Sequence, residues 1–348
     1  MPNALVLDDA GRALLGRHAD WWQRRGMLNA VVPDVPLGDL WLPLADGSEA
    51  RQDLDVTPEM LDPDRLAGEP QEPGPLRTQG DLFISAAPYS RVPWVEAILG
   101  TPIRATIVGG SMRTRAFARD WAEWENLPAH RSEPWFDLLR RLTALLVERS
   151  GGRHAVVHTL MRGPSDLAEA VLGSEMMCLS LYDHPAPLRR FLEEATETFL
   201  AILEAQTALI PTVSSGYVNP FGIWAPGTVV RTQCDATAFL SAAQYERWFL
   251  PYDERICRAV GYSVIHLHSC SLHTVDALLA VERPQAIQVT LESEASGPPL
   301  KAMLPIFRKI LASKPLIVDG PLTAEEVRLV RDALPHDGLC LIAHQAGG

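Results

Sequence analysis

Short apolar segments alternate with amphipathic segments along most of the chain. In the C-terminal part, the pattern predicts strands over 262–268, 286–292, 315–320 and 338–344. Between them, apolar residues at helical spacing predict helices over 274–281, 299–313 and 323–334. Earlier segments predict strands over 81–88, 102–110, 153–160, 212–219 and 227–235, and helices over 93–100, 133–150, 165–173, 187–209 and 241–261. Apolar strands separated by helices are typical of a parallel sheet with both faces covered.

The number of predicted strands favours a (β/α)8 TIM barrel over a doubly wound sheet. No G-x-G-x-x-G follows a strand and no Walker A motif is present, so the sequence lacks the motifs of a nucleotide-binding, doubly wound sheet. Prolines and acidic residues crowd 26–80, where only a hairpin around 40–44 is expected, after a short helix over 11–25. We therefore expect a loop-rich N-terminal extension over 1–80, packed on an α/β barrel formed by 81–348.

Composition and charge narrow the classes of partner. The 348 residues include 43 acidic and 31 basic side chains, a net charge of −12, which argues against nucleic acid as the main partner. No stretch approaches the roughly 20 apolar residues of a membrane helix. Asp8 and Asp9 stand where a signal peptide would be basic and apolar, so we expect a cytoplasmic protein. The five cysteines are scattered, which disfavours a disulfide framework.

The segment IHLHSCSLH (265–273) carries the densest chemistry in the chain. His266 and His268 share one face of the predicted strand, because side chains two positions apart point to the same side. Cys270 and His273 follow where the strand ends. Zinc accepts mixed nitrogen and sulfur ligands, and the pair His268 and Cys270 would supply two of the three that a catalytic site needs. The alternative is that these are ordinary, partly buried side chains at a barrel mouth.

Other polar residues also lie at predicted strand ends, where catalytic groups of barrel enzymes gather. Asp235 could bind a substrate cation, hydrogen-bond a histidine, act as a base or cap the next helix. His344 ends the last strand and Cys340 lies within it. We assign the candidates as follows: catalytic Asp235, His266 and Tyr217; substrate-binding Arg162, Asn219 and His158; metal-binding His268, Cys270, His344 and Cys340.

Four segments carry a family resemblance: PWVEAILG (93–100), RGPSDLAEAVLG (162–173), QCDATAFLSAAQYERWFLPY (233–252) and VIHLHSC (264–270). In this order and spacing, from about Asp81 to the C-terminus, the chain resembles the uroporphyrinogen decarboxylase superfamily. That superfamily also includes zinc-dependent, corrinoid-linked methyltransferases. The resemblance implies a (β/α)8 barrel.

Departures from the family pattern separate its branches. The R-Q-A-G-R-Y segment of the decarboxylases is absent, and Phe83-Ile84-Ser85-Ala86 stands where their F-S-D motif would be, with alanine in place of the aspartate. The methyltransferases use an H-x-C pair and a distant cysteine for zinc. His268-Ser269-Cys270 matches the pair, whereas the distant cysteine falls near Ala346. His344 or Cys340 would replace it, or the protein holds no zinc.

Three functions follow as hypotheses. The resemblance implies a methyltransferase in which a zinc-activated thiol or similar nucleophile takes a methyl group from a corrinoid protein or a small methylated compound. The alternative is a metal-independent lyase, a decarboxylase acting on a small carboxylic acid that Arg162 would hold. The third is a barrel without activity that serves as a binding partner.

Overall fold

The computed structural model describes residues 5–34, 38–116, 118, 120–125, 131–292 and 297–345. Ala346, the position aligned with the distant family cysteine, lies outside the described residues.

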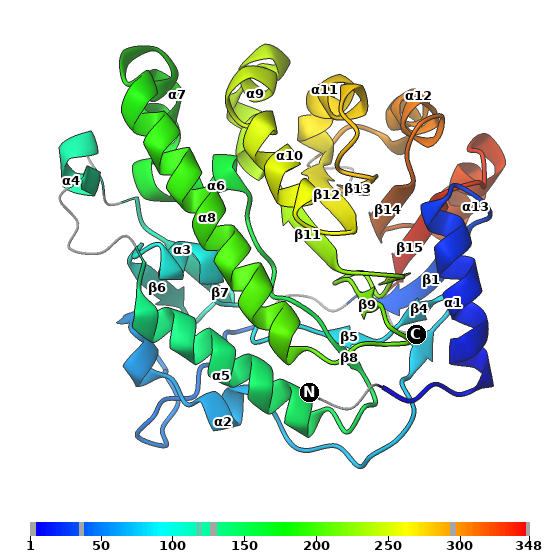
Figure 1. The fold of residues 1–348 in the computed structure, drawn as a ribbon, viewed down its shortest axis with the longest axis horizontal. Coiled ribbons are helices and arrows are strands. Elements are labelled where there is room, and N and C mark those ends of the chain that lie inside the picture. Colours follow the sequence, from blue (N-terminus) through cyan, green and yellow to red (C-terminus); the bar gives the residue numbers. More distant parts are fainter. Residues whose placement is uncertain are drawn as a thin grey trace.

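A parallel sheet of six strands forms the centre of the molecule (Figure 1). Its strands are β1 (Leu28–Pro33), β11 (Val229–Gln233), β12 (Tyr262–His268), β13 (Ala286–Thr290), β14 (Leu316–Pro321) and β15 (Leu339–Gln345). The strand order is β1-β15-β14-β13-β12-β11, and every neighbouring pair is parallel. The prediction of an α/β fold with a parallel sheet is confirmed.

Strand β1 departs from the expected domain boundary. We expected 1–80 to be an extension on the main fold, but β1 pairs with β15 along its whole length, from Leu28 opposite Cys340 to Pro33 opposite Gln345. The sequence pattern did not predict this strand, because the segment LNAVVP is short and precedes a proline-rich stretch that is typical of loops.

Shorter strands lie outside the six-stranded sheet. Strands β5 (Ser85–Ala86) and β8 (Ala155–Val156) form a separate parallel pair. The other small sheets are antiparallel and consist of β2 (Leu54–Val56), β6 (Ile103–Thr106) and β7 (Ser111–Thr114); β3 (Thr78–Gln79) and β4 (Leu82–Phe83); and β9 (Tyr217–Val218) and β10 (Trp224–Ala225). The segments predicted as strands over 102–110 and 212–219 therefore belong to small antiparallel sheets.

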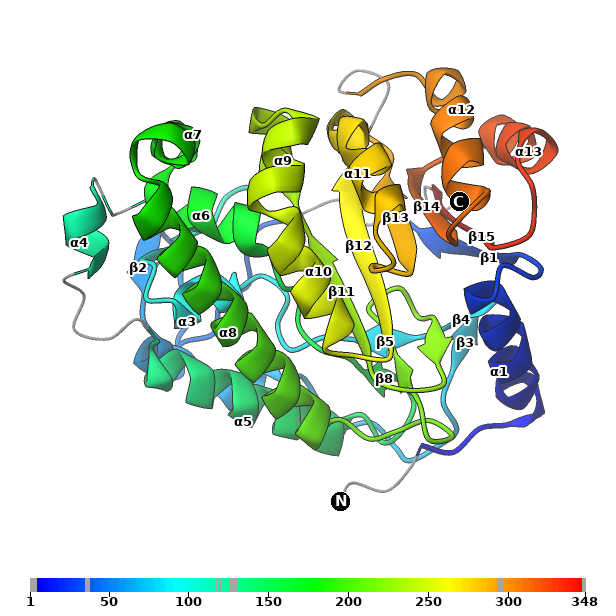
Figure 2. The same ribbon diagram turned by 45° about the horizontal axis from the view of Figure 1, so that its top comes forward.

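Helices follow the strands of the sheet and lie along its outside, with β5 and β8 on the other side (Figures 1 and 2). The α-helices are α1 (Asp9–Trp22), α2 (Pro63–Leu66), α3 (Trp94–Ile98), α4 (Trp121–Glu125), α5 (Glu133–Arg149), α6 (Pro164–Leu172), α7 (Ser174–Asp183), α8 (Pro185–Leu209), α9 (Ala242–Trp248), α10 (Leu250–Arg258), α11 (Val275–Ala280), α12 (Leu300–Leu311) and α13 (Ala324–Ala333). Short 3₁₀ helices are η1 (Pro58–Met60), η2 (Asp235–Phe239) and η3 (Ser269–Thr274). Within the described ranges, no helix combines the length and the apolar character needed to cross a membrane.

The helix predicted over 241–261 is divided into α9 and α10 at Phe249. Pro251 follows in the first turn of α10, where its missing N–H group costs no helical hydrogen bond.

Alternation along the strands assigns the two faces of the sheet. Ile265, Leu267 and Val289 belong to the large core shared with the outer helices. Val264 and Cys340 point the other way, into a smaller apolar cluster that includes Trp22 of α1. His266 and His268 continue the inner face of β12 toward its C-terminal end. The inner face is thus apolar at its base and polar at the C-terminal ends of its strands.

Helix α1 is tied to the inner cluster by a buried histidine. His18 is fully buried, its Nε2 lies 2.6 Å from the carbonyl oxygen of Asp81, and its Nδ1 accepts from the backbone N–H of Trp224 at 2.9 Å. These two contacts require a neutral ring with its proton on Nε2. Burial lowers the pKa of His18 from 6.5 to about 4.

This burial predicts a loss of stability in mild acid. Because the folded protein holds His18 neutral, its contribution is complete above pH 6.5 and is lost as the pH falls to about 4. The loss amounts to about 3 kcal/mol for the full shift. In urea unfolding, His18→Gln should be less stable near pH 7 and show a shallower fall over this interval. The exposed-histidine variant His336→Gln should follow the wild type, and a slope unchanged by His18→Gln would contradict the assignment.

Candidate metal centre

Three side chains at the C-terminal ends of β11 and β12 converge on one point. Asp235 Oδ1 lies 3.5 Å from His266 Nε2, and Asp235 Oδ2 lies 3.7 Å from His268 Nε2. One ligand atom from each of the three residues lies within 4.8 Å of the others. Within the described part of the chain, this is the one group of three or more histidine, cysteine or acidic residues with such geometry.

The local sequence explains the convergence. Strand β12 places His266 and His268 on its inner face, and their rings meet edge to face with centroids 4.8 Å apart. Strand β11 ends at Gln233, and the chain turns into η2, which begins at Asp235. The turn is anchored by the backbone N–H of Ala236, which donates to Asp166 Oδ1 at 2.8 Å.

A neighbouring strand fixes the ring of His266. Its Nδ1 is hydrogen-bonded to Oε1 of Gln288, which lies opposite His266 in the register of β12 and β13. The Gln288 amide nitrogen donates to Thr290 Oγ1 at 2.9 Å, so its oxygen is the atom left to accept from His266. The proton of a neutral His266 therefore resides on Nδ1, and the lone pair of Nε2 points toward Asp235.

A carboxylate holds His268 in the same tautomer. Its Nδ1 lies 2.6 Å from Glu292 Oε1, and the second oxygen of Glu292 accepts from the hydroxyl of Ser269. Burial acts to raise the pKa of Glu292, but the hydrogen bonds from Ser269 and His268 outweigh it and lower the pKa. A charged Glu292 that accepts from Nδ1 leaves Nε2 of His268 free to bind a cation.

Asp235 is held by a third chain of contacts. Gln233 Nε2 donates to Asp235 Oδ2 at 2.7 Å, and Arg231 donates through Nη1 to the oxygen of the same amide. Asp235 Oδ1 is buried, and no donor among the described residues reaches it. All three candidate ligands thus have a fixed outer partner and an atom left over, as in sites where second contacts orient metal ligands.

The electrostatics of the site favour capture of a cation. Burial and the neighbouring charge of Asp166 raise the pKa of Asp235 to about 6. Burial and the nearby Arg231 lower the pKa of His266 well below its usual value, so its ring stays neutral. Burial also lowers the pKa of Arg231 to about 10. Near pH 7 the site therefore offers the neutral imidazole of His266 and the carboxylate of Asp235, forms in which metals are bound.

The structure separates the other proposed metal ligands from this group. Cys270 is exposed on η3, with Sγ 3.9 Å from Ser271 Oγ, and His273 Nε2 contacts the carbonyl oxygen of Leu240 at 2.9 Å. Cys340 is fully buried on the inner face of β15. His344 Nε2 lies 2.7 Å from Asp319 Oδ1 on β14. β13 lies between β14 and β12, so these two strands are two spacings or about 10 Å apart, and β15, which carries His344, is about 14 Å from β12.

The proposed substrate-binding and catalytic residues are spread more widely. Arg162 Nε lies 3.2 Å from the buried carboxylate of Glu96, and its charge interacts with that of Asp235. His158 is buried, and its Nε2 accepts from the backbone N–H of Arg231 at 3.0 Å. This hydrogen bond links the segment after β8 to β11. These contacts place Arg162 near the centre and His158 within the framework behind it.

Asn219 and Tyr217 belong to the β9–β10 hairpin. Asn219 is buried, and its Oδ1 accepts from the backbone N–H groups of Phe221 and Ile223 at 2.9 and 3.1 Å, so it holds the turn. Tyr217 lines a separate cavity together with Thr228, which precedes β11, and Val260, which precedes β12. Tyr217 therefore lies toward the opposite ends of these strands from Asp235.

Several residues of the centre were not among the sequence candidates. Gln288 and Glu292 lie in the segment AIQVTLE, and Arg231 and Gln233 lie in VVRTQ. A polar residue within an otherwise buried strand was the available signal, because such a group needs a partner. The identity of each partner depends on strand register, which the sequence pattern does not specify.

The fold and the site define an α/β protein with a candidate Asp-His-His metal centre at the C-terminal ends of parallel strands. Its structure is similar to that of a methyltransferase from Methanosarcina mazei, with a TM-score of 0.59 and 13% sequence identity over 96% of this chain and 93% of that chain. At this identity the likeness concerns the fold alone. No protein-family model matches the sequence, and no curated protein matches it.

The centre predicts a defined metal-binding behaviour. In calorimetric titration of metal-free protein, zinc should bind near pH 7, and Asp235→Asn or His268→Gln should weaken binding at least a hundredfold. Glu292→Gln should weaken it by about 10- to 100-fold, because the ring of His268 loses its charged partner. Affinity should fall as the pH drops below about 6, where a proton competes for Asp235.

The matched control for this titration is His336→Gln, because His336 is exposed and contacts a backbone carbonyl. Zinc binding that survives Asp235→Asn unchanged would contradict the assigned centre.

Proposed function

We propose that this chain is a metal-dependent methyltransferase of the uroporphyrinogen decarboxylase superfamily. In this proposal it transfers a methyl group to a thiol or similar nucleophile, with zinc as the metal. The observation that carries the proposal is the trio Asp235, His266 and His268, whose carboxylate and Nε2 atoms face one another at the carboxyl ends of parallel strands. The Methanosarcina mazei protein with a similar fold is a methyltransferase, and we take the same reaction class for this proposal.

The proposal includes an eight-stranded barrel. β1 and β11 are the two edge strands of the six-stranded sheet. In the proposed barrel, the pair β5–β8 would lie between these two edges and join them. Two contacts support this at the β8 side: His158 accepts from the backbone of Arg231, and the N–H of Gly163 donates to the carbonyl of Gln233 at 2.9 Å. At the β1 side, the N–H of Asp81 donates to the carbonyl of Asn29 at 2.9 Å. Closure would gather the carboxyl ends of all eight strands around one mouth.

The residues present fit a zinc ion. Zinc binds imidazole nitrogen and carboxylate oxygen, and a catalytic zinc has three protein ligands and an open position. His266 and His268 would supply Nε2, and Asp235 would supply the buried Oδ1 that has no other partner among the described residues. This set shares only His268 with the family's H-x-C pair, and it does not use Cys270.

A bound zinc ion would act as a Lewis acid that lowers the pKa of a substrate thiol and holds it as the more nucleophilic thiolate. In the transfer, the sulfur forms a bond to the methyl carbon, and the donor keeps the electron pair of the broken bond. The donor in this proposal is a corrinoid carried by a partner protein or a small methylated compound. Gln288 and Glu292 keep the two rings in the tautomer that binds, so little reorganisation is needed at the centre.

Arg162 would bind an anionic part of the substrate. Its side chain is 43% exposed, whereas its partner Glu96 is 2% exposed. The guanidinium is therefore paired with a buried carboxylate and is still partly accessible to solvent. An arginine fixed in this way favours a carboxylate or similar anion.

The same arginine supports the second candidate function, a lyase that decarboxylates a small acid without a metal. In that reaction Arg162 would hold the substrate, and the histidines would move the proton. Activity that survives complete removal of metal would select this candidate over methyl transfer.

Cobalt substitution tests the ligand set and the thiol together. Protein loaded with Co²⁺ in place of zinc should show no thiolate-to-cobalt charge-transfer band at rest, because its ligands are nitrogen and oxygen. Addition of 2-mercaptoethanol should create the band by filling the open position. With methylcobalamin as donor, the same protein in its zinc form should methylate 2-mercaptoethanol, and His268→Gln should abolish this.

The control variant is Cys270→Ser, which should leave both readings unchanged. A band in the resting protein that Cys270→Ser removes would establish the H-x-C ligand set instead. A protein that binds zinc but forms no band with the thiol and transfers no methyl group would refute the proposed function.

A further inference from the structure

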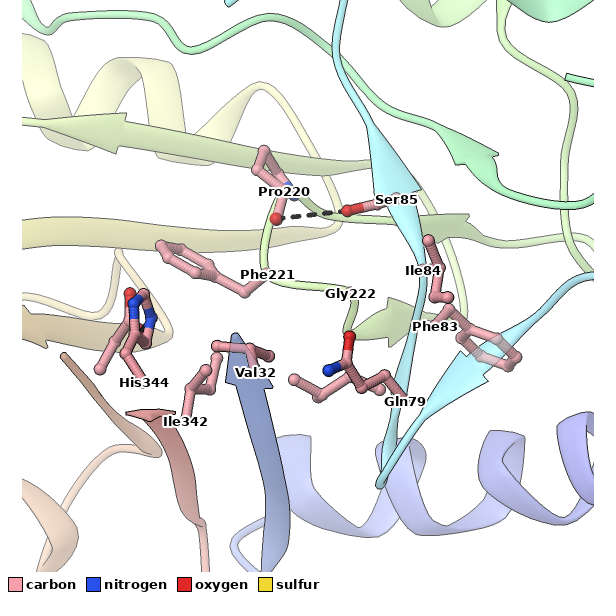
Figure 3. Close-up of a pocket in the computed structure, with 12 residues that line it drawn as sticks. Val32, Gln79, Phe83, Ile84, Ser85, Pro220, Phe221, Gly222, Ile342 and His344 are labelled. Carbon is pink, nitrogen blue, oxygen red and sulfur yellow. Dashed lines mark hydrogen bonds and ion pairs between the residues drawn. The ribbon is translucent and has the colours of Figure 1, made fainter. Parts of the chain in front are cut away.

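A cavity of about 270 Å³ lies against β1, β14 and β15, and none of the residues of the candidate metal centre lines it. Its walls are mainly apolar, and Figure 3 shows Pro220 and Phe221 on one side, Val32 and Ile342 on another, and His344 at one end. Ligand pockets commonly measure about 300–1,000 Å³, so this cavity suits a compact molecule. At about 30 Å³ per water-sized group, it has room for about nine non-hydrogen atoms.

Strand register places the cavity on the same inner face as the metal centre. His268 lies opposite Thr290, and Thr290 lies opposite Asp319, which lines the cavity. The separation from β12 to β14 is about 10 Å, two strand spacings. His344 lies on β15, opposite Pro321 and three strand spacings, about 14 Å, from β12, so a molecule that contacts His344 would extend toward His268 across the inner face of the sheet.

The aromatic wall is built rigidly. The N–H of Phe83 donates to the carbonyl of Gly222 at 2.9 Å, and Asn219 holds the turn at Phe221 from within. A Cβ atom at Gly222 would lie 2.4 Å from the carbonyl oxygen of Phe83, and Gly222 has a φ of +76°, so only glycine permits this approach. The backbone that carries Phe221 is thus held in place before any ligand arrives, which reduces the entropy lost on binding.

One end of the cavity carries a polarised imidazole. His344 Nε2 is bonded to Asp319 Oδ1, and this hydrogen bond raises the pKa of His344. Nδ1 is the remaining polar atom of the ring, and the side chain is 34% exposed. The hydrogen bond to Asp319 favours the protonated ring, in which Nδ1 also carries a proton and can donate to an anionic oxygen. Arg231 adds a buried positive charge behind this region, with its guanidinium 6.0 Å from the ring centroid of Phe221.

We propose that this cavity binds the organic part of the substrate, and that the substrate is a small carboxylate with a planar or branched apolar body. The carboxylate accepts from Nδ1 of His344, and the apolar body packs against Phe221, Val32 and Ile342. This assignment rests on the proposed function for the role of the ligand as substrate. It gives His344 a binding role, distinct from the metal-ligand role that the sequence suggested.

Benzoate is a suitable probe because it has the predicted size, one carboxylate and a flat apolar body. In saturation-transfer NMR and calorimetry on the full chain, benzoate should bind, and benzyl alcohol should bind at least tenfold more weakly. His344→Gln should weaken benzoate at least tenfold and leave benzyl alcohol unchanged. Phe221→Leu should weaken both compounds.

The controls are His336→Gln and Phe136→Leu, which change the same residue types away from the cavity and should bind benzoate like the wild type. Circular dichroism and zinc content, measured on every variant, separate misfolding and metal loss from loss of the ligand. Equal binding of benzoate and benzyl alcohol, or of benzoate to wild type and His344→Gln, would overturn the proposal. So would loss of zinc from folded His344→Gln.

The same measurements separate this proposal from the proposed function. Failure of benzoate to bind a protein that binds zinc and 2-mercaptoethanol overturns the cavity assignment alone. Benzoate binding that depends on His344, in a protein that binds no zinc, supports the cavity and refutes the metal-dependent function.

Discussion

The parallel register of β11, β12 and β13 is the constraint on which the candidate centre depends. It places Gln233 opposite His266, and His266 opposite Gln288, in one row across three strands. A slip of one residue in β12 would turn both histidines toward the outer helices and bring Ile265 and Leu267 to the inner face. The large apolar core under those helices opposes such a slip, because Ile265 and Leu267 are completely buried in it. The burial of apolar side chains on the outer face of β12 therefore keeps His266 and His268 on its inner face.

The buried polar side chains on this inner face would destabilise the fold if they had no hydrogen-bond partners. A buried polar group without a hydrogen bond costs about 1–3 kcal/mol, and more when it is charged. Gln288, Glu292 and Gln233 meet this requirement for His266, His268 and Asp235 in turn, each from one side only. The side that remains unmet is the one where the three residues face each other. Side chains that are held from outside and face one another with ligand atoms form a geometry suited to hold a cation.

Alternation along the chain was sufficient to predict the α/β class and the shared face of His266 and His268. It also pointed to Asp235, because a carboxylate directly after a buried strand lies at the end where parallel strands expose their polar groups. It could not identify Glu292 or Gln288 as partners, because those pairings join residues 22 and 24 positions apart through strand register. Strand β1 was missed for a related reason: its evidence lies in the pairing with β15, more than 300 residues away. The local sequence pattern predicts which face a side chain occupies and where a strand ends. The hydrogen-bond and strand partners depend on tertiary packing, which the local pattern does not specify.

The proposed ligand set contains no sulfur, and this has a consequence for the charge of a bound ion. A divalent ion held by two neutral imidazoles and one carboxylate keeps one net positive charge, whereas an ion held by one imidazole and two thiolates keeps none. The higher charge lowers the pKa of a bound thiol more strongly and also attracts anions to the mouth. In the proposed arrangement, Arg162 and the pair of His344 and Asp319 lie at separate positions around this centre. An anionic substrate would then be drawn toward the ion by its charge and oriented by its contacts with these side chains, so attraction and orientation come from different residues.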